Sequence, residues 1–235
     1  MNANGLVNQN PDLQKYFSEF SPSDIDKIEV LHIPAGTAIE DEKSEESSVY
    51  FIVRGICSVY RKIENGDDFN YYKISNNDVF GLTNVINPYN RLADAKFVAM
   101  TDITLFRIRK TRFKRFTDVY TKFYHMVTVD IITRLHDSLA MHVECKKYNS
   151  TINIVSYLIY SYRTYLKMFD KGYEGYVPIS ETRAIISDFT GISIRSINNT
   201  IDLLKNLEYI SIIKGKVNIN AEEYQKLLSY KADNI

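Results

Sequence analysis

A change in hydrophobic period near residue 111 constrains the fold more than any other feature of this sequence. From Leu31 to Arg109 the chain consists of short runs of β-branched and aromatic residues separated by turn signals. From about Thr111 the apolar residues recur at helical spacing for about 35 residues. The sequence therefore predicts a compact β domain followed by a long amphipathic helix.

The β part contains five runs typical of strands, punctuated by Gly55, Asn65-Gly66 and Asn76-Asn77-Asp78. The runs are residues 49–53, 56–60, 69–74, 97–100 and 104–108. Asn65-Gly66 is a hairpin signal, because Asn and Gly tolerate the positive φ angles of tight turns. Many short strands at this spacing predict a small barrel or sandwich. Before them, Phe17, Phe20, Ile25 and Ile28 are spaced as in two short helices.

The long helix carries an apolar stripe in steps of four residues: Phe123, Val127, Ile131, Leu135 and Leu139. A helix of this length that leaves a compact domain needs a partner for its apolar face. A second copy of the same helix in a dimer supplies that partner most economically, so we assign dimerisation to these five residues. The alternative, in which the helix packs only on its own domain, stays open at this point.

The last part of the chain reads as helix, tight turn, helix and hairpin. Residues 151–169 form a further aromatic helix, and a domain boundary is expected near Asn149. Ser180 is predicted to cap a helix that ends at Phe189, Gly191 supplies the turn, and Ser193 caps the second helix. A hairpin of residues 209–213 and 216–219 then turns at Lys214-Gly215.

The second of these helices divides into two faces. Ile197, Ile201 and Leu204 form an apolar face, and the polar residues lie off it: Arg195, Ser196, Asn198, Asn199 and Asp202. Arginine pairs with guanine and asparagine with adenine in the major groove, and lysines of a wing contact phosphates. The pattern indicates a DNA reader, although a polar helix face is also an ordinary solvated surface.

Motifs distributed along the chain resemble the Crp/Fnr family, the relatives of the cyclic AMP receptor protein. They are residues 34–39 (PAGTAI), 50–55 (YFIVRG), 64–66 (ENG), 78–81 (DVFG), 101–113 and 183–207, the last including Gly191 and Ser193. The resemblance implies an α+β chain with three parts. These are an N-terminal cyclic-nucleotide-binding-type β-roll, or jelly roll (residues 1–110), a connecting dimerisation helix (111–148) and a C-terminal winged helix-turn-helix domain (149–235).

The function that the resemblance implies is a homodimeric, sequence-specific transcription regulator. Its partners would be double-stranded DNA with a palindromic operator, a second copy of itself and RNA polymerase. The expected DNA-binding residues are Arg183, Ser193, Ile194, Arg195, Ser196, Asn198, Asn199, Lys214 and Lys216. Ile194 and Arg195 stand where the family usually has Arg and Glu, and Asn199 where it has a later Arg, so we expect a different operator sequence. Ile194 can contact a thymine methyl group.

The sensor half departs from the cyclic-AMP-binding members of the family. The predicted effector pocket consists of Phe80, Gly81, Leu82, Thr83, Arg91 and Asp94. Leu82 occupies the place of the family's ribose-binding Glu, and Ala93-Asp94 the place of its phosphate-binding Arg-Ser pair. A cyclic nucleotide would lack its counter-cation there, and Arg91 is the remaining substitute. We expect an unknown small-molecule effector other than cyclic AMP, or none.

The composition of the chain argues against several classes of protein and site. Lys and Arg number 29, as do Asp and Glu, so any DNA surface must be local. No apolar run approaches the ~18 residues of a membrane span, and the sparse cysteines fit a reducing cytoplasm. His142 with Cys145 is the only metal-ligand-like pair, and we expect no metal, other cofactor or enzymatic site. The basic cluster, defined as Arg107, Arg109, Lys110, Arg112, Lys114 and Arg115, is either a solvated junction or a DNA or polymerase contact.

A different class of function also stays open. In it the chain is a small-molecule-binding or protein-interaction module whose DNA-binding domain no longer functions.

Overall fold

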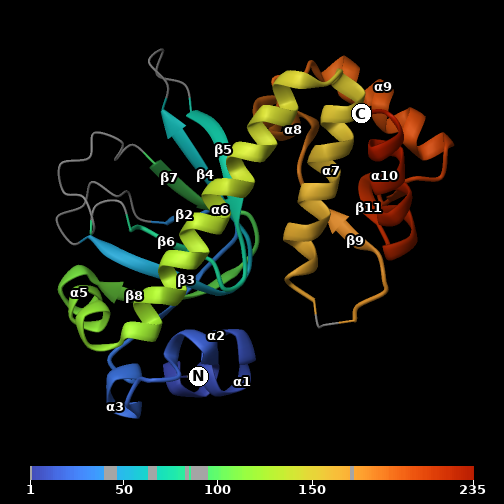
Figure 1. The fold of residues 1–235 in the computed structure, drawn as a ribbon. Coiled ribbons are helices and arrows are strands. Elements are labelled where there is room, and N and C mark those ends of the chain that lie inside the picture. The colour runs from blue at the N-terminus through green and yellow to red at the C-terminus, as the bar shows by residue number, and fades with distance from the viewer. Residues whose placement is uncertain (1, 40–46, 63–67, 83–84, 86–94, 170–171) are drawn as a thin grey trace. The chain divides into compact units, whose positions relative to one another are not determined.

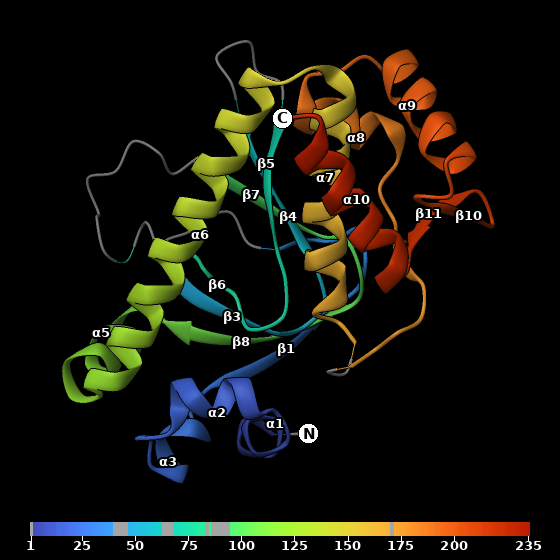
Figure 2. The same ribbon diagram turned by 45° about the vertical axis from the view of Figure 1, so that its right-hand side comes forward.

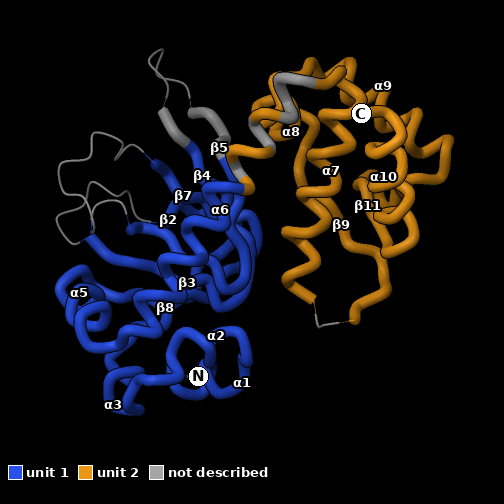
Figure 3. Tube along the Cα trace, viewed as in Figure 1, with its two compact units in different colours: residues 1–136 blue, residues 137–235 orange. Residues whose placement is uncertain are grey.

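The chain folds into two compact units, residues 1–136 and 137–235 (Figure 3). The computed structural model describes residues 2–39, 47–62, 68–82, 85, 95–169 and 172–235. The boundary between the units falls inside a helix, within the segment assigned above to the connecting helix. Each unit is described by itself.

The first unit contains a β-roll of two four-stranded antiparallel sheets (Figure 1). One sheet has the order β1-β8-β3-β6 and the other β2-β7-β4-β5. The strands are β1 (Glu29–Ile33), β2 (Ala38–Ile39), β3 (Ser48–Arg54), β4 (Cys57–Lys62), β5 (Asp68–Ile74), β6 (Val79–Phe80), β7 (Ala95–Ala99) and β8 (Ile103–Arg109). All five strand runs expected from the sequence are strands, and the α+β fold class is confirmed.

The hairpin expected at Asn65-Gly66 is consistent with the pairing of its strands. β4 and β5 pair antiparallel from Cys57 opposite Ile74 to Lys62 opposite Asp68. The turn residues themselves lie outside the described residues.

Two apolar clusters lie on opposite faces of the β1-β8-β3-β6 sheet, because successive side chains of a strand point to opposite faces. On β3, Tyr50 and Ile52 belong to the interior cluster between the two sheets. Val49, Phe51 and Val53 belong to the outer cluster, which the helices cover. A strand buried on both faces reads as a continuous apolar run, as β3 does.

Three short helices precede the roll, where the sequence predicted two. They are α1 (Ala3–Gln9), α2 (Pro11–Phe17) and α3 (Pro22–Ile25). Asn10 ends α1 and caps α2, since its side chain accepts from the backbone N–H groups of Asp12 and Leu13, and Pro11 takes the first helical position. These helices bury Phe17 and Phe20 against rings of the sheet and of α6, with centroid separations of 5.1–5.9 Å for Phe17 to Phe51, Phe106 and Phe123 and for Phe20 to Phe123.

The predicted single long helix is two helices, α5 (Lys110–Val119) and α6 (Thr121–Lys147). The helix breaks at Tyr120, whose φ and ψ of −108° and 90° are extended. Contacts from the N-terminal helices fix the break: the Tyr120 hydroxyl donates to Asp24 at 2.6 Å, and the Lys122 N–H donates to the Glu19 carboxylate at 3.0 Å. Glu19 therefore accepts from one of the N–H groups that the start of α6 leaves without a helical partner.

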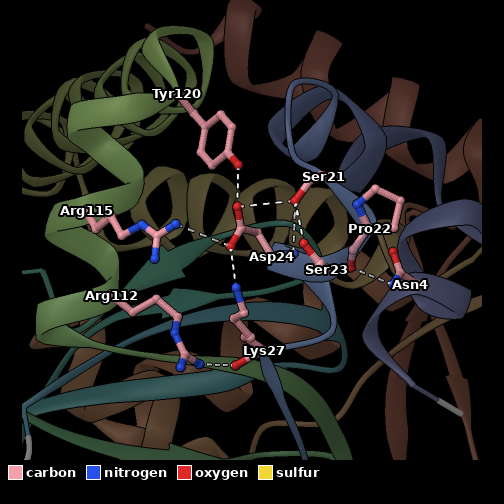
Figure 4. A network of polar contacts seen from close by, with 9 residues as sticks. All are labelled: Asn4, Ser21, Pro22, Ser23, Asp24, Lys27, Arg112, Arg115 and Tyr120. Carbon is pink, nitrogen blue, oxygen red and sulfur yellow. Dashed lines mark hydrogen bonds and ion pairs between the residues drawn. The ribbon is translucent and has the colours of Figure 1, made fainter.

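Asp24 is the centre of the polar network between the N-terminal helices and α5 (Figure 4). Its buried carboxylate also accepts from Lys27 Nζ at 2.9 Å and lies 3.8 Å from Arg115. The hydrogen bonds from Tyr120 and Lys27 lower the pKa of Asp24 to about 2. Arg112 in turn donates to the Lys27 carbonyl. Two members of the basic cluster, Arg112 and Arg115, therefore help to hold the N-terminal helices against α5.

The second unit has a three-stranded sheet and four described helices after the end of α6 (Figure 2). Its elements are α7 (Ser150–Leu166), β9 (Val177–Ile179), α8 (Arg183–Thr190), α9 (Ile194–Asn206), β10 (Ser211–Ile213), β11 (Lys216–Ile219) and α10 (Ala221–Asp233), with strand order β10-β11-β9. α10 packs on α7, where Tyr224 stacks on Tyr162 at 4.5 Å and accepts a hydrogen bond from Arg163 at 2.6 Å. Neither β9 nor α10 was predicted from the sequence.

Replacing Tyr120 with Phe tests the corner between α5 and α6. The ring and its stacking on Phe20 remain, but Asp24 loses a hydrogen bond, so we expect the free energy of unfolding at pH 7 to fall by about 1–3 kcal/mol. The folded pKa of Asp24 is depressed, so this contribution is complete above pH ~4 and is lost as the pH falls toward ~2. Urea unfolding of wild type and Y120F from pH 7 to pH 3 should show the difference shrinking. Y124F, at an exposed tyrosine one turn on, is the control, and a pH-independent difference would contradict the assignment.

Candidate nucleic-acid interface and sensor domain

The helix-turn-helix lies at α8 and α9, as predicted, with one correction at its start. Thr182, and not Ser180, caps α8, because its hydroxyl accepts from the Ile185 N–H at 3.3 Å. Gly191 ends α8 in the left-handed region with φ +70°, and Ser193 caps α9 by accepting from the Ser196 N–H at 3.2 Å. The predicted turn at Gly191 and cap at Ser193 are confirmed.

α9 shows the two predicted faces. Ile197, Ile201 and Leu204 are buried, together with Thr200. Arg195, Asn198, Asn199 and Asp202 are exposed, Ser196 is half-buried, and Ile194 at the first helical position is 48% exposed. An isoleucine held half in solvent at the tip of a helix is available for an apolar contact with another molecule.

The polar side chains of this surface are not used inside the protein. Within the part of the chain that the structure describes, the side chains of Arg195, Asn198 and Asn199 make no hydrogen bond or ion pair. The same holds for Arg183, which is half-buried at the start of α8. Long polar side chains without internal partners are free to reach a ligand.

The wing is the hairpin of β10 and β11. Ile213 pairs with Lys216, so Lys214 and Gly215 are the two turn residues, with φ of +51° and +75°. Two positive φ angles are the geometry of a type I′ turn, which Asn-Gly fits without strain, whereas a lysine in the left-handed region costs about 1–2 kcal/mol. Lys214 and Lys216 are both exposed. The turn at Lys214 therefore carries a backbone strain that asparagine would largely remove.

α7 packs against α8 and so supports the helix-turn-helix. Phe189 of α8 packs on Tyr157 and Tyr160 of α7, at centroid distances of 5.0 and 5.8 Å. Glu181, just before α8, is buried and accepts from the Tyr157 hydroxyl at 3.2 Å and from Ser161 at 3.4 Å. Burial and the Glu181 charge raise the pKa of Tyr157, so its hydroxyl remains a donor. This cluster fixes the entry to α8.

The predicted effector residues do not all lie together: Phe80 belongs to the interior cluster, Leu82 belongs to the outer cluster, and three others lie outside the described residues. Phe80 is buried in the interior cluster and packs between Tyr50 at 4.9 Å and Phe97 at 4.5 Å. Gly81 has φ +80°, and a Cβ there would lie 2.4 Å from the Ser48 carbonyl oxygen, so only glycine fits. Leu82 belongs to the outer apolar cluster. Thr83, Arg91 and Asp94, like Ala93, lie outside the described residues.

The predicted dimerisation stripe needs a correction in its first half. Phe123 and Val127 are 0% and 3% exposed because they pack in the chain's own outer cluster, so they are core residues and not the seam of a dimer, and Ile131 packs against the same cluster. Leu135 and Leu139 are 55% and 58% exposed, as the prediction requires. Ile132, which the sequence places beside this stripe, is 61% exposed, and Val143, which was not predicted, is 62% exposed. The spacing of four residues from Leu139 to Val143 was the available signal for Val143.

The described residues hold no group of three or more His, Cys, Asp or Glu side chains placed to bind a metal ion, and the side chains of His142 and Cys145 are not described. Among the same residues no helix combines the length and the apolar character that a membrane span requires.

Comparison with known proteins gives the class of fold. Residues 30–120 match the family model of the cyclic nucleotide-binding domain. Solved structures with the same fold include FixK2 from Bradyrhizobium japonicum, with TM-score 0.70, 13% identity, and 86% of this chain and 96% of that chain covered. A Crp/Fnr-family transcriptional regulator from Eubacterium rectale has TM-score 0.68 and 13% identity, with 96% of this chain and 99% of that chain covered. A CooA variant from Carboxydothermus hydrogenoformans has TM-score 0.66 and 13% identity, with 98% of this chain and 96% of that chain covered.

The chain therefore has the fold of Crp/Fnr transcription regulators over nearly its whole length, and the resemblance predicted from sequence is confirmed at the level of fold. By sequence, no curated protein matches it.

Proposed function

We propose that this chain is a dimeric, sequence-specific DNA-binding transcription regulator. The observation that carries the proposal is the exposed tip of α9, where Ile194, Arg195, Asn198 and Asn199 form a surface without internal polar partners. Such a tip fits the major groove, with Arg195 on a guanine and Asn198 or Asn199 on an adenine. The fold shared with Crp/Fnr regulators supports the same function.

The operator itself provides the first test. Selection from a random DNA duplex pool should enrich a palindrome whose half-sites lie about one helical turn, roughly 34 Å, apart. Failure to enrich any sequence would favour the alternative function, a small-molecule-binding or protein-interaction module. RNA polymerase remains a proposed further partner.

Arg195→Ala should weaken binding to the selected operator by about 1–3 kcal/mol and relax the preference at one base pair of each half-site. The reason is the loss of a bidentate contact to a base edge. The matched control is Lys122→Ala, an exposed cation on α6, which should leave the selected sequence unchanged. Competition with operators mutated one position at a time measures both effects. Equal losses at every position would show that Arg195 contacts phosphate only.

Lys214→Asn should separate stability from function. Asparagine adopts the left-handed conformation more easily, so the free energy of unfolding should rise by up to about 1 kcal/mol. Binding to all duplexes should weaken together, and the slope of log affinity against log salt should fall by about one per wing lysine removed. Thermal unfolding and salt-dependent fluorescence anisotropy provide the two readouts. Unchanged affinity would remove Lys214 from the interface.

Dimerisation is proposed through the exposed apolar residues of α6: Ile132, Leu135, Leu139 and Val143. Leu135→Asp should convert a dimer to a monomer in sedimentation and abolish operator binding, because it puts a charge in the seam while leaving the chain's own core untouched. Val119→Asp is the matched control, at an apolar residue 59% exposed at the end of α5. A dimer that survives L135D would place the interface elsewhere.

The effector of the roll interior is proposed to be a small molecule other than cyclic AMP, or to be dispensable. Leu82, which takes the place of the family's ribose-binding acid, is 8% exposed within the outer apolar cluster and offers no hydrogen bond to a ribose. Repeating the operator selection with and without a metabolite pool tests ligand dependence.

A further inference from the structure

A pocket with no assigned role lies where α5 meets α6 in the first unit. It is an open pocket of about 370 Å³, lined chiefly by Phe113, Lys114, Tyr124, Val127, Ile131 and Ile132. Phe113 and Val127 belong to the outer cluster, so the pocket lies on the helical side of the sheet, away from the interior that holds Phe80. Its volume is within the range of small-molecule sites, roughly 300–1,000 Å³.

The wall of this pocket offers little polar recognition. Its two threonines use their hydroxyl hydrogens within their own helices: Thr117 donates to the Lys114 carbonyl and Thr128 to the Tyr124 carbonyl, each at 2.8 Å. Polar donors directed at a ligand are then restricted to the ammonium of Lys114 and the exposed hydroxyl of Tyr124. A ligand that fits this wall has an apolar body and one polar end.

The charge of that polar end follows from the basic cluster. Arg107 and Arg109 pair with Glu29, Arg115 lies near Asp24, and Arg112 donates to a backbone carbonyl. Lys110 also has a partner. Among the described residues, the side chain of Lys114 alone in the cluster has no hydrogen bond or ion pair. An unpaired cation at the edge of an apolar pocket complements an anion.

We propose that this pocket binds a medium-chain carboxylate, with the chain against Phe113, Val127 and Ile131 and the carboxylate on Lys114 Nζ. Each added methylene buried in the pocket should improve affinity about three- to fourfold until the pocket is full. Binding at this site does not depend on DNA binding. The ligand would lie beside Ile132, which also belongs to the exposed apolar face of α6.

The experiment is calorimetric titration of the full-length chain with decanoate, below its micelle concentration, and with decanol. We expect one decanoate bound per chain, with octanoate bound more weakly. Lys114→Met should weaken decanoate binding at least about tenfold and leave decanol binding unchanged, because it removes the charge and keeps the length. Lys122→Met, at an exposed lysine outside the pocket, should change neither.

Thr128→Trp supplies a second test that keeps the Lys114 charge. Thr128 is half-buried on the wall, so a large side chain there should fill the pocket and abolish binding of both decanoate and decanol. Helical circular dichroism and a cooperative unfolding transition verify that the variant is folded.

Two outcomes would overturn the proposal. The first is absence of decanoate binding; if the wild-type dimer also dissociates in T128W, the pocket holds a second copy of the chain instead. The second is decanoate binding that survives T128W, since the ligand would then lie elsewhere, for example in the roll interior.

Discussion

The corner at Tyr120 is the constraint on which the rest of the first unit depends. Asp24 and Glu19, both from the N-terminal segment, hold the two sides of this corner through the Tyr120 hydroxyl and the Lys122 N–H. With the corner fixed, Phe123 enters the outer cluster among the rings of Phe17, Phe20 and Phe51. The rotation of α6 about its own axis is then set, and this determines which apolar residues are buried and which face solvent.

That rotation explains why the sequence predicted the helical stripe well and its partner poorly. The spacing of Phe123, Val127, Ile131, Leu135 and Leu139 identifies a helix face, but periodicity carries no information about what covers it. In the structure the first residues of this face, Phe123 and Val127, are buried in the chain's own core, whereas the last ones, Leu135 and Leu139, are exposed. The break itself has no local signal, since no Pro or Gly occurs there, and the side chains that cause it lie 96 and 103 residues away in sequence.

The helix-turn-helix and hairpin of the second unit were predictable because their determinants are local. Gly191 and Ser193 act through contacts within three or four residues, and the wing follows from a two-residue turn between paired strands. The start of α8 was misplaced because Ser180 and Thr182 both suit an N-cap and only geometry distinguishes them. β9 was missed because it is three residues long and contains Pro178, which can lie only at a sheet edge. The signal for α10 was present: Asn220 and Glu223 form a capping box.

A chain with no net charge can bind DNA only through a local arrangement of charge, and the second unit shows how this arises. Glu181 and Glu223 are buried, and Glu222 pairs with Lys226, while Arg183, Arg195, Lys214 and Lys216 have no internal partner among the described residues. In the proposed dimer, these four cations of each copy would supply about eight contacts, and they alone would contribute at most roughly seven to the salt slope. Non-specific affinity would then be modest, and operator choice would rest on the few base contacts at the tip of α9.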